Sequence, residues 1–132
     1  MPIRPGRQAS YIYMSARVLI LGLRPGLVEN FRRELGGEDV ELLTGTDLDG
    51  LRAAFVDQDV DHVILGGGLD IATRADAVRE VFRLSDRATV HMKDQLSGPE
   101  GFVPFARSLL RGLADYEPKP SPNAVLRAQR PD

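Results

Sequence analysis

Short apolar runs alternate along the chain with longer segments whose apolar residues recur at every third or fourth position. The apolar runs are residues 17–21, 40–43, 60–65 and 88–92. Their length and continuity are typical of strands. The longer segments are residues 27–35, 47–57, 73–84 and 103–114. Their spacing predicts amphipathic helices. Strand and helix therefore alternate, which indicates an α/β domain built on a parallel sheet.

The same periodicity predicts which side chains of the helices face the sheet. The inward residues are predicted to be Leu27, Val28, Phe31, Leu35, Leu48, Leu51, Phe55, Ala77, Val78, Val81, Phe82, Phe105, Ala106, Leu109, Leu110 and Leu113. Thr73-Arg74-Ala75-Asp76 is typical of a helix start, and Ser97 with Glu100 has the spacing of a capping box. Pro104 lacks a backbone donor, so we expect a short turn at 98–102 before the last helix.

The expected burial of each strand indicates its position in the sheet. The runs at 17–21 and 60–65 are continuously apolar, as central strands of a parallel sheet are. Glu41 and His91 interrupt the other two runs, which suits edge strands. Right-handed crossovers then favour the order 2-1-3-4, a three-layer α/β/α arrangement of the flavodoxin-like kind. The alternative order 3-2-1-4 is less favoured because it puts the strand with Glu41 in the centre.

The chain of 132 residues suits one domain. We expect a flexible arm at 1–15, the folded domain at 16–115 and a Pro-rich flexible tail at 116–132. Tyr11-Ile12-Tyr13 is interpreted as a loosely packed extension, with an extra edge strand as the alternative. Met14 is an alternative start to Met1.

Composition excludes several classes of function. A net charge of -2 gives no general attraction for nucleic acid or an anionic membrane, so neither is expected as a partner. The absence of cysteine excludes disulfides and thiolate metal sites, and it fits a cytoplasmic protein. The two histidines have no metal-ligand spacing with each other or with a carboxylate cluster, so no metal is expected.

The predicted order places a ligand crevice above the strands at 17–21 and 60–65, at their carboxyl ends. Gly66, Gly67 and Gly68 follow the second of these strands directly. Glycines allow backbone N–H groups to turn towards an anion. The structural alternative is a tight joint between strand and helix that needs positive φ.

The loop after the first strand carries Gly22 and Arg24. It lacks the G-x-G-x-x-G pattern, because Arg24 stands where the second glycine is needed, so a dinucleotide is disfavoured and no cofactor is evident. Arg24 is a candidate contact for a phosphate or carboxylate. The alternative is a solvated loop arginine.

The loop after the last strand adds polar candidates. Lys93 is one of only two lysines, and it is a candidate charge for an anion, with Asp94 to orient it or accept a proton. A surface ion pair between the two is the alternative. Ser97 is a candidate hydroxyl donor and Asp70 a candidate general base, although helix capping accounts for each. The two histidines are interpreted as structural.

The segment 61–92 resembles the middle of a response-regulator receiver domain in its apolar strands and spacing. The resemblance implies a flavodoxin-like fold. The receiver's phosphoacceptor aspartate would fall at Gly66, and its acidic pair near Gly22 and Leu23, which cannot bind Mg²⁺. Its hydroxyl residue would fall near Lys93, and its fifth strand has no counterpart. The resemblance therefore implies a domain that is not phosphorylated in the usual way.

Three functions follow as hypotheses. The first is the binding of an anionic small molecule in the glycine-lined crevice, with or without a chemical reaction there. The residues expected to bind it are Gly22, Arg24, Gly66, Gly67, Gly68, Lys93 and Ser97. The second is a non-catalytic, receiver-like interaction module. The third is a small enzyme that uses Asp70 or Asp94 as a base beside Lys93. An exposed last strand also predicts a homodimer through that strand or the last helix.

Overall fold

The computed structural model describes residues 16–22, 25–34, 40–57, 59–113 and 116. The predicted arm at 1–15, the tail from 117 onward and the candidate residue Arg24 lie outside these residues. The same holds for the side chains of Leu27, Val28 and Leu35, three of the predicted inward residues of the first helix.

Strands and helices alternate as the hydrophobic pattern predicts. In chain order they are β1 Ala16–Leu21, α1 Pro25–Glu34, β2 Val40–Gly45, α2 Leu48–Asp57, β3 His62–Leu65, α3 Ile71–Leu84, β4 Thr89–Met92, the 3-10 helix η1 Pro99–Gly101 and α4 Phe102–Leu113. Helix α4 contains Pro104 in its first turn, where a backbone N–H has no partner inside the helix. The proline is therefore tolerated there, and α4 begins one residue before the predicted start.

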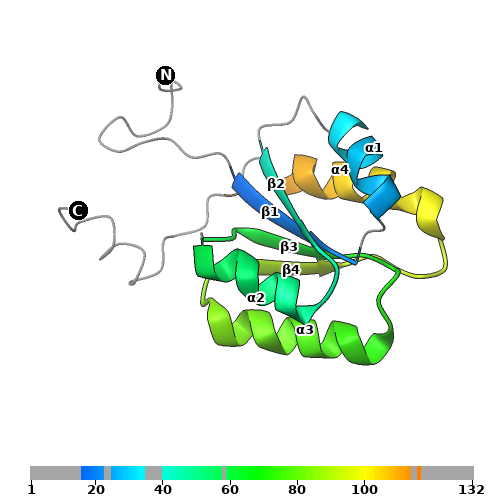
Figure 1. The fold of residues 1–132 in the computed structure, drawn as a ribbon. Helices are drawn as coiled ribbons and strands as arrows, with labels where there is room; N and C mark the ends of the chain where they lie inside the picture. The colour runs from blue at the N-terminus through cyan, green and yellow to red at the C-terminus, as the bar shows by residue number, and fades with distance from the viewer. Residues whose placement is uncertain (1–15, 23–24, 35–39, 58, 114–115, 117–132) are drawn as a thin grey trace, which may run out of the picture.

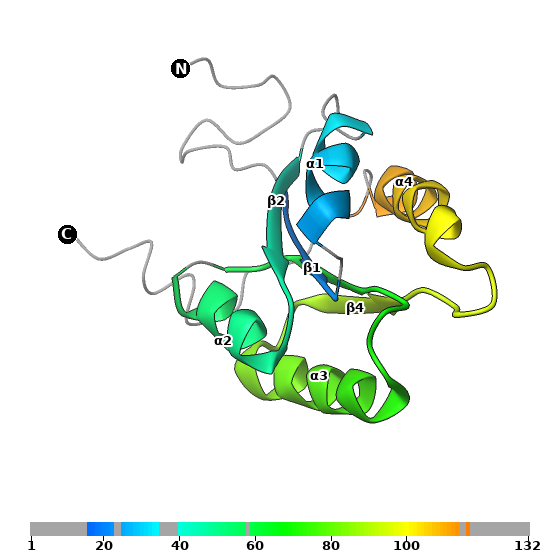
Figure 2. The ribbon, with the colours of Figure 1, turned by 45° about the vertical axis from the view of Figure 1, so that its right-hand side comes forward.

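The four strands form one parallel sheet in the order β2-β1-β3-β4, which confirms the flavodoxin-like order. Helices α1 and α4 lie on one face of the sheet, and α2 and α3 lie on the other (Figure 1). Figure 2 shows the same three layers after a turn about the vertical axis. None of the helices within the described residues has the length and hydrophobicity of a membrane span.

Alternation along β1 explains why its run is continuously apolar. Val18 and Ile20 belong to the core beneath α1 and α4. Leu19 and Leu21 belong to the core beneath α2 and α3. Because successive side chains of a strand point to opposite faces, a strand covered on both faces needs apolar residues throughout. All four side chains are fully buried.

Two aromatic residues of the helices differ from the prediction. Phe82 on α3 is 67% exposed although the periodicity placed it inward. Its neighbour Val81 takes the buried position, and a helix turns about 100° per residue, so Phe82 points away from the sheet. Phe102, which the prediction missed, is buried and packs against Phe31 with ring centroids 5.2 Å apart.

Candidate functional site

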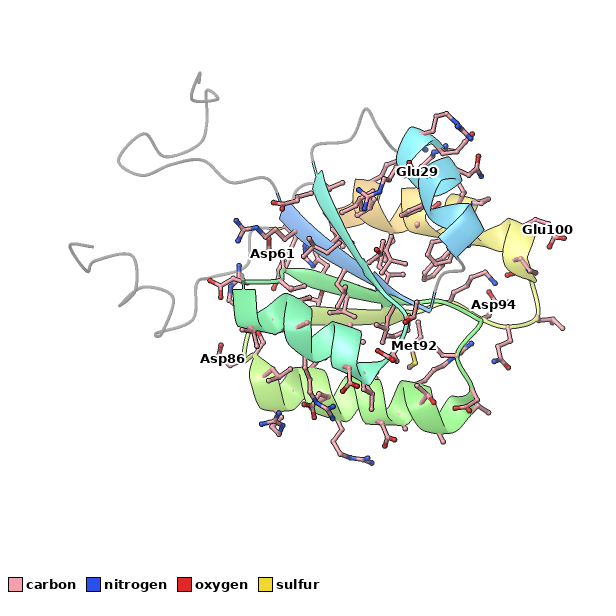
Figure 3. All side chains as sticks on the ribbon, viewed as in Figure 1. Glu29, Asp61, Asp86, Met92, Asp94 and Glu100 are labelled. Atoms are coloured by element: carbon pink, nitrogen blue, oxygen red, sulfur yellow. The ribbon has the colours of Figure 1, made fainter. Side chains whose placement is uncertain are left out.

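The ends of three strands meet at the carboxyl edge of the sheet. The Gly66 amide donates to the Leu21 carbonyl oxygen at 2.8 Å, and the Lys93 amide donates to the Leu65 carbonyl oxygen at 3.1 Å. The loops after β1, β3 and β4 therefore begin side by side. Figure 3 shows Asp94 at this end of the sheet, and Asp61 at the opposite end.

Three of the predicted glycines serve close packing. Gly22 has a φ of 90°, and a Cβ there would lie 2.6 Å from Leu69 Cγ. A Cβ on Gly68 would lie 3.0 Å from the Gly22 carbonyl oxygen, and one on Gly66 would lie 3.4 Å from the Leu21 carbonyl oxygen. Glycine at these positions lets the β3–α3 loop lie directly on the end of β1 and buries Leu69 beneath it.

The structural alternative for the triple glycine is a tight joint between strand and helix that needs positive φ. That requirement for positive φ is wrong. Among the described residues, positive φ occurs only at Gly22 and Gly98. Gly66, Gly67 and Gly68 adopt backbone conformations that other residues can also adopt. Steric closeness to β1, and not the left-handed region, explains Gly66 and Gly68. Gly67 needs a different explanation.

Gly67 borders a small space lined by two cations. A Cβ on Gly67 would lie 3.7 Å from Arg74 Nη2, 3.7 Å from the Asp94 carbonyl oxygen and 3.8 Å from Lys93 Nζ. These are ordinary contact distances, so one methyl group fits there. Gln95 Nε2 donates to the Leu69 carbonyl oxygen at 3.3 Å and to that of Gly67 at 3.5 Å, which helps to hold the loop. The position of this methyl group is therefore bordered by both cations and by the Asp94 carbonyl oxygen.

Lys93 is buried, with 3% of its surface exposed. Its Nζ donates to the Asp94 carbonyl oxygen at 2.7 Å. Within the described residues it makes no ion pair, so the alternative of a surface ion pair with Asp94 is wrong. An ammonium group has three donors, and two of them have no partner among the residues that the structure describes. A buried cation without a counter-ion is unfavourable in the isolated protein.

Arg74 on α3 is the second cation, and the sequence reasoning missed it. Its Nε donates to the Leu69 carbonyl oxygen and its Nη1 to the Lys93 carbonyl oxygen, both at 3.2 Å. These bonds fix the guanidinium, while Nη2 is buried and has no partner in the described part of the chain. One signal was available, because a cation in the first turn of a helix is opposed by the helix dipole.

Asp94 and Ser97 bind each other. The carboxylate of Asp94 accepts from the Ser97 amide at 2.8 Å and from Ser97 Oγ at 3.0 Å. These bonds, with the nearby charge of Lys93, lower the pKa of Asp94 and make it a weaker base. The capping box predicted at Ser97 is wrong, because Gly98 is the N-cap of η1 and no side chain bonds there.

Asp70 caps α3, as the structural reading of this residue predicts. Its carboxylate accepts from the Thr73 amide at 2.7 Å, and α3 therefore begins at Ile71 and not at Thr73. The hydrogen bonds from Thr73 lower the pKa of Asp70. The side chain is exposed, and its hydrogen bond is made to the N-terminus of α3.

The histidines share one hydroxyl group on the α1 and α4 side of the sheet. Thr89 Oγ1 lies 2.6 Å from His62 Nδ1 and 2.8 Å from His91 Nε2. Burial lowers the pKa of both rings. His62 is itself buried, and its ring lies 6.2 Å from that of Tyr116. No cluster of potential metal ligands occurs among the described residues.

The structure thus brings together the triple glycine, Lys93, Asp94, Ser97 and the unforeseen Arg74, and it leaves Asp70 on a helix cap. Comparison with models of protein families, with curated proteins and with solved structures found no match.

Proposed function

We propose that the protein binds the anionic group of a small molecule in the space between Arg74, Lys93 and Gly67. One observation supports this above the others. Two cations face one small space, and neither forms an ion pair with a carboxylate within the described residues. A bound anion would supply the missing counter-charge.

The donor geometry favours an oxyanion. Within the described residues, Arg74 Nη2 and two donors of Lys93 Nζ have no hydrogen-bond partner, so both groups can donate to an oxyanion. Such charge-assisted hydrogen bonds are stronger than neutral ones. Gly67 is partly exposed and Gly68 is exposed, so the β3–α3 loop beside these donors reaches the protein surface. Phosphate and carboxylate groups share this chemistry. The carboxyl edge of a parallel sheet is also where such folds bind ligands.

Titration calorimetry of the full chain with inorganic phosphate, glycerol phosphate and acetate tests the proposal. Arg74→Gln removes one donor set, and we expect it to weaken binding at least about tenfold, since a charged hydrogen bond is worth about 1.5–3 kcal/mol. Gly67→Ala adds one methyl group at the anion position without a steric clash in the empty protein. It should weaken binding and leave thermal stability unchanged.

Arg79→Gln is the matched control. Arg79 lies on the same helix, is largely exposed and pairs with Asp76. It makes the same change of charge outside the site, so affinity should stay within about twofold of the parent at moderate salt. Failure of all three anions to bind the parent would contradict the proposal. Equal weakening by Arg74→Gln and Arg79→Gln would show that net charge alone is responsible.

A receiver-like interaction module is the second candidate. The observation that favours it is the position of Gly66 and Gly22, which directly follow β3 and β1 in a sheet of order 2-1-3-4. Such a module would act through its surface and not through phosphorylation. The enzyme hypothesis draws little support from the site, because the hydrogen bonds that lower the pKa of Asp70 and Asp94 make both weaker bases.

A further inference from the structure

Strand β4 ends the sheet with an open row of backbone groups. The amides of Thr89 and Lys93 both donate towards β3, to the carbonyl oxygens of Asp61 and Leu65 at 3.1 Å. Because backbone groups alternate in direction along a strand, those of Val90 and Met92 point away from β3. Within the described residues no strand lies on that side.

Within the described part of the chain, this edge lacks the features that keep exposed strands apart. Natural edges are blunted by proline, by charged side chains or by a covering helix. The other edge strand, β2, carries the exposed Glu41, which pairs with Arg17 at 3.2 Å. Residues 88–92 contain neither a proline nor a formally charged side chain at neutral pH.

Large apolar side chains are exposed at the carboxyl end of β4 and on the neighbouring helix. Met92 is 52% exposed and Leu96, which follows β4, is 98% exposed. Phe82 is exposed on α3, the helix that lies beside β4 in both views (Figures 1 and 2). The open backbone and the apolar surface together form an interaction surface.

We propose that this edge pairs with β4 of a second copy of the chain, in antiparallel orientation, to form one sheet across a homodimer. Two identical strands related by a two-fold axis are antiparallel. Val90 would exchange hydrogen bonds with the partner's Met92, because both turn their backbone groups outward. His91 would then lie on the axis.

Charge selects this register. Centring the axis on His91 sets Arg87 opposite the partner's Gln95, and Ala88 opposite the partner's Asp94. Centring it on Val90 sets Asp86 opposite the partner's Asp94 and Arg87 opposite the partner's Lys93. Like charges directly opposite each other are destabilising. The register at His91 avoids both repulsions and keeps Val90 and Met92 of both copies on the α3 side.

Sedimentation of the full chain across the micromolar range tests the proposal. Met92→Pro removes only an outward donor at the end of the strand, so the β3–β4 ladder remains. Met92→Leu keeps the donor and changes only the side chain. We expect a dimer for the parent and for Met92→Leu, and a monomer for Met92→Pro. A monomeric parent, or a dimer that survives Met92→Pro, overturns the proposal.

Cysteine cross-linking gives a second measurement that does not depend on Met92→Pro folding. The chain has no cysteine, so one introduced thiol can pair only with its copy. Directly opposed residues without hydrogen bonds have Cα atoms about 4.5 Å apart, within the range of a disulfide. His91→Cys should therefore cross-link under mild oxidation, and Thr73→Cys, on α3, should not. No cross-link at His91→Cys overturns the proposal.

Discussion

Charged side chains at the two ends of the parallel sheet have different kinds of partner. At the amino end, the Asp61 carboxylate accepts from the Arg17 amide at 2.8 Å and pairs with the Arg87 guanidinium. At the carboxyl end, the side chains of Arg74 and Lys93 bond, among the described residues, only to backbone carbonyl oxygens. Figure 3 shows Asp61 and Asp94 at these opposite ends.

The difference separates a charge that the fold pairs with a carboxylate from charges that have no carboxylate partner among the described residues. Arg74 and Arg87 are both partly buried, and each donates a hydrogen bond to a backbone carbonyl oxygen, so burial alone does not distinguish them. A carboxylate partner does. A buried pair contributes to the fold only while both members remain, whereas a buried cation without an anion opposes folding. Substitutions at the two ends should therefore change stability in opposite directions.

The largest effect is expected at the amino end. Asp61→Asn keeps an acceptor for the Arg17 amide but leaves Arg87 without its carboxylate. We expect the free energy of unfolding to fall by about 3 kcal/mol, the usual effect of breaking a buried pair on one side. Urea unfolding measures it.

Glu41→Gln is the control for this substitution. It breaks the more exposed pair between Glu41 and Arg17 at 3.2 Å. Such pairs contribute less than about 1 kcal/mol. Equal losses for Asp61→Asn and Glu41→Gln would contradict the structural role assigned to the amino end.

A smaller effect of opposite sign is expected at the carboxyl end. Lys93→Met keeps a long apolar stem and removes a buried charge that makes one hydrogen bond to the described residues. Without a ligand, the free energy of unfolding should rise by about 1 kcal/mol, because the desolvated charge is gone. Phosphate should no longer raise the melting temperature. A loss of stability on this substitution would show that Lys93 supports the fold.

The smallest effect concerns the histidines on the α4 side. Burial lowers the pKa of His62 and His91, with Arg87 adding to the effect at His62 and Asp61 opposing it. As pH falls below about 6.5, the unfolded chain takes up protons that the folded chain refuses, so stability falls. The slope is at most about 1.4 kcal/mol per pH unit for each histidine.

Urea unfolding at pH about 7.5 and about 5.5 measures this dependence, above the range where carboxylates titrate. His62→Asn retains a polar atom near the position of Nδ1, opposite Thr89 Oγ1. It should reduce the loss of stability at the lower pH. An unchanged pH dependence in His62→Asn would assign the effect to other groups.

The sheet order could be predicted because it depends on local patterns. Glu41 marks an edge, and β1 is apolar on both faces, so the sequence alone favours 2-1-3-4. The position of the site in the fold could be predicted from the sequence, but the contacts among its residues could not. The contact of Gly22 with Leu69 and the burial of Lys93 depend on loops distant in sequence. Arg74 was missed because its unfilled hydrogen-bond position is visible only in the structure, and its unfavourable place in the first turn of a helix was the signal in the sequence.

The pairing of β1 has a consequence for how the protein opens. Among the described residues of one copy, β1 has a neighbouring strand on each side, whereas β4 has only β3. Amide protons of β1 should therefore exchange with solvent only on global unfolding, and those of β4 through local opening. Arg74 Nη1 donates to the Lys93 carbonyl oxygen, directly after β4. Each local opening of β4 would separate the two cations, so a bound anion would slow hydrogen exchange along an edge strand that it does not cover.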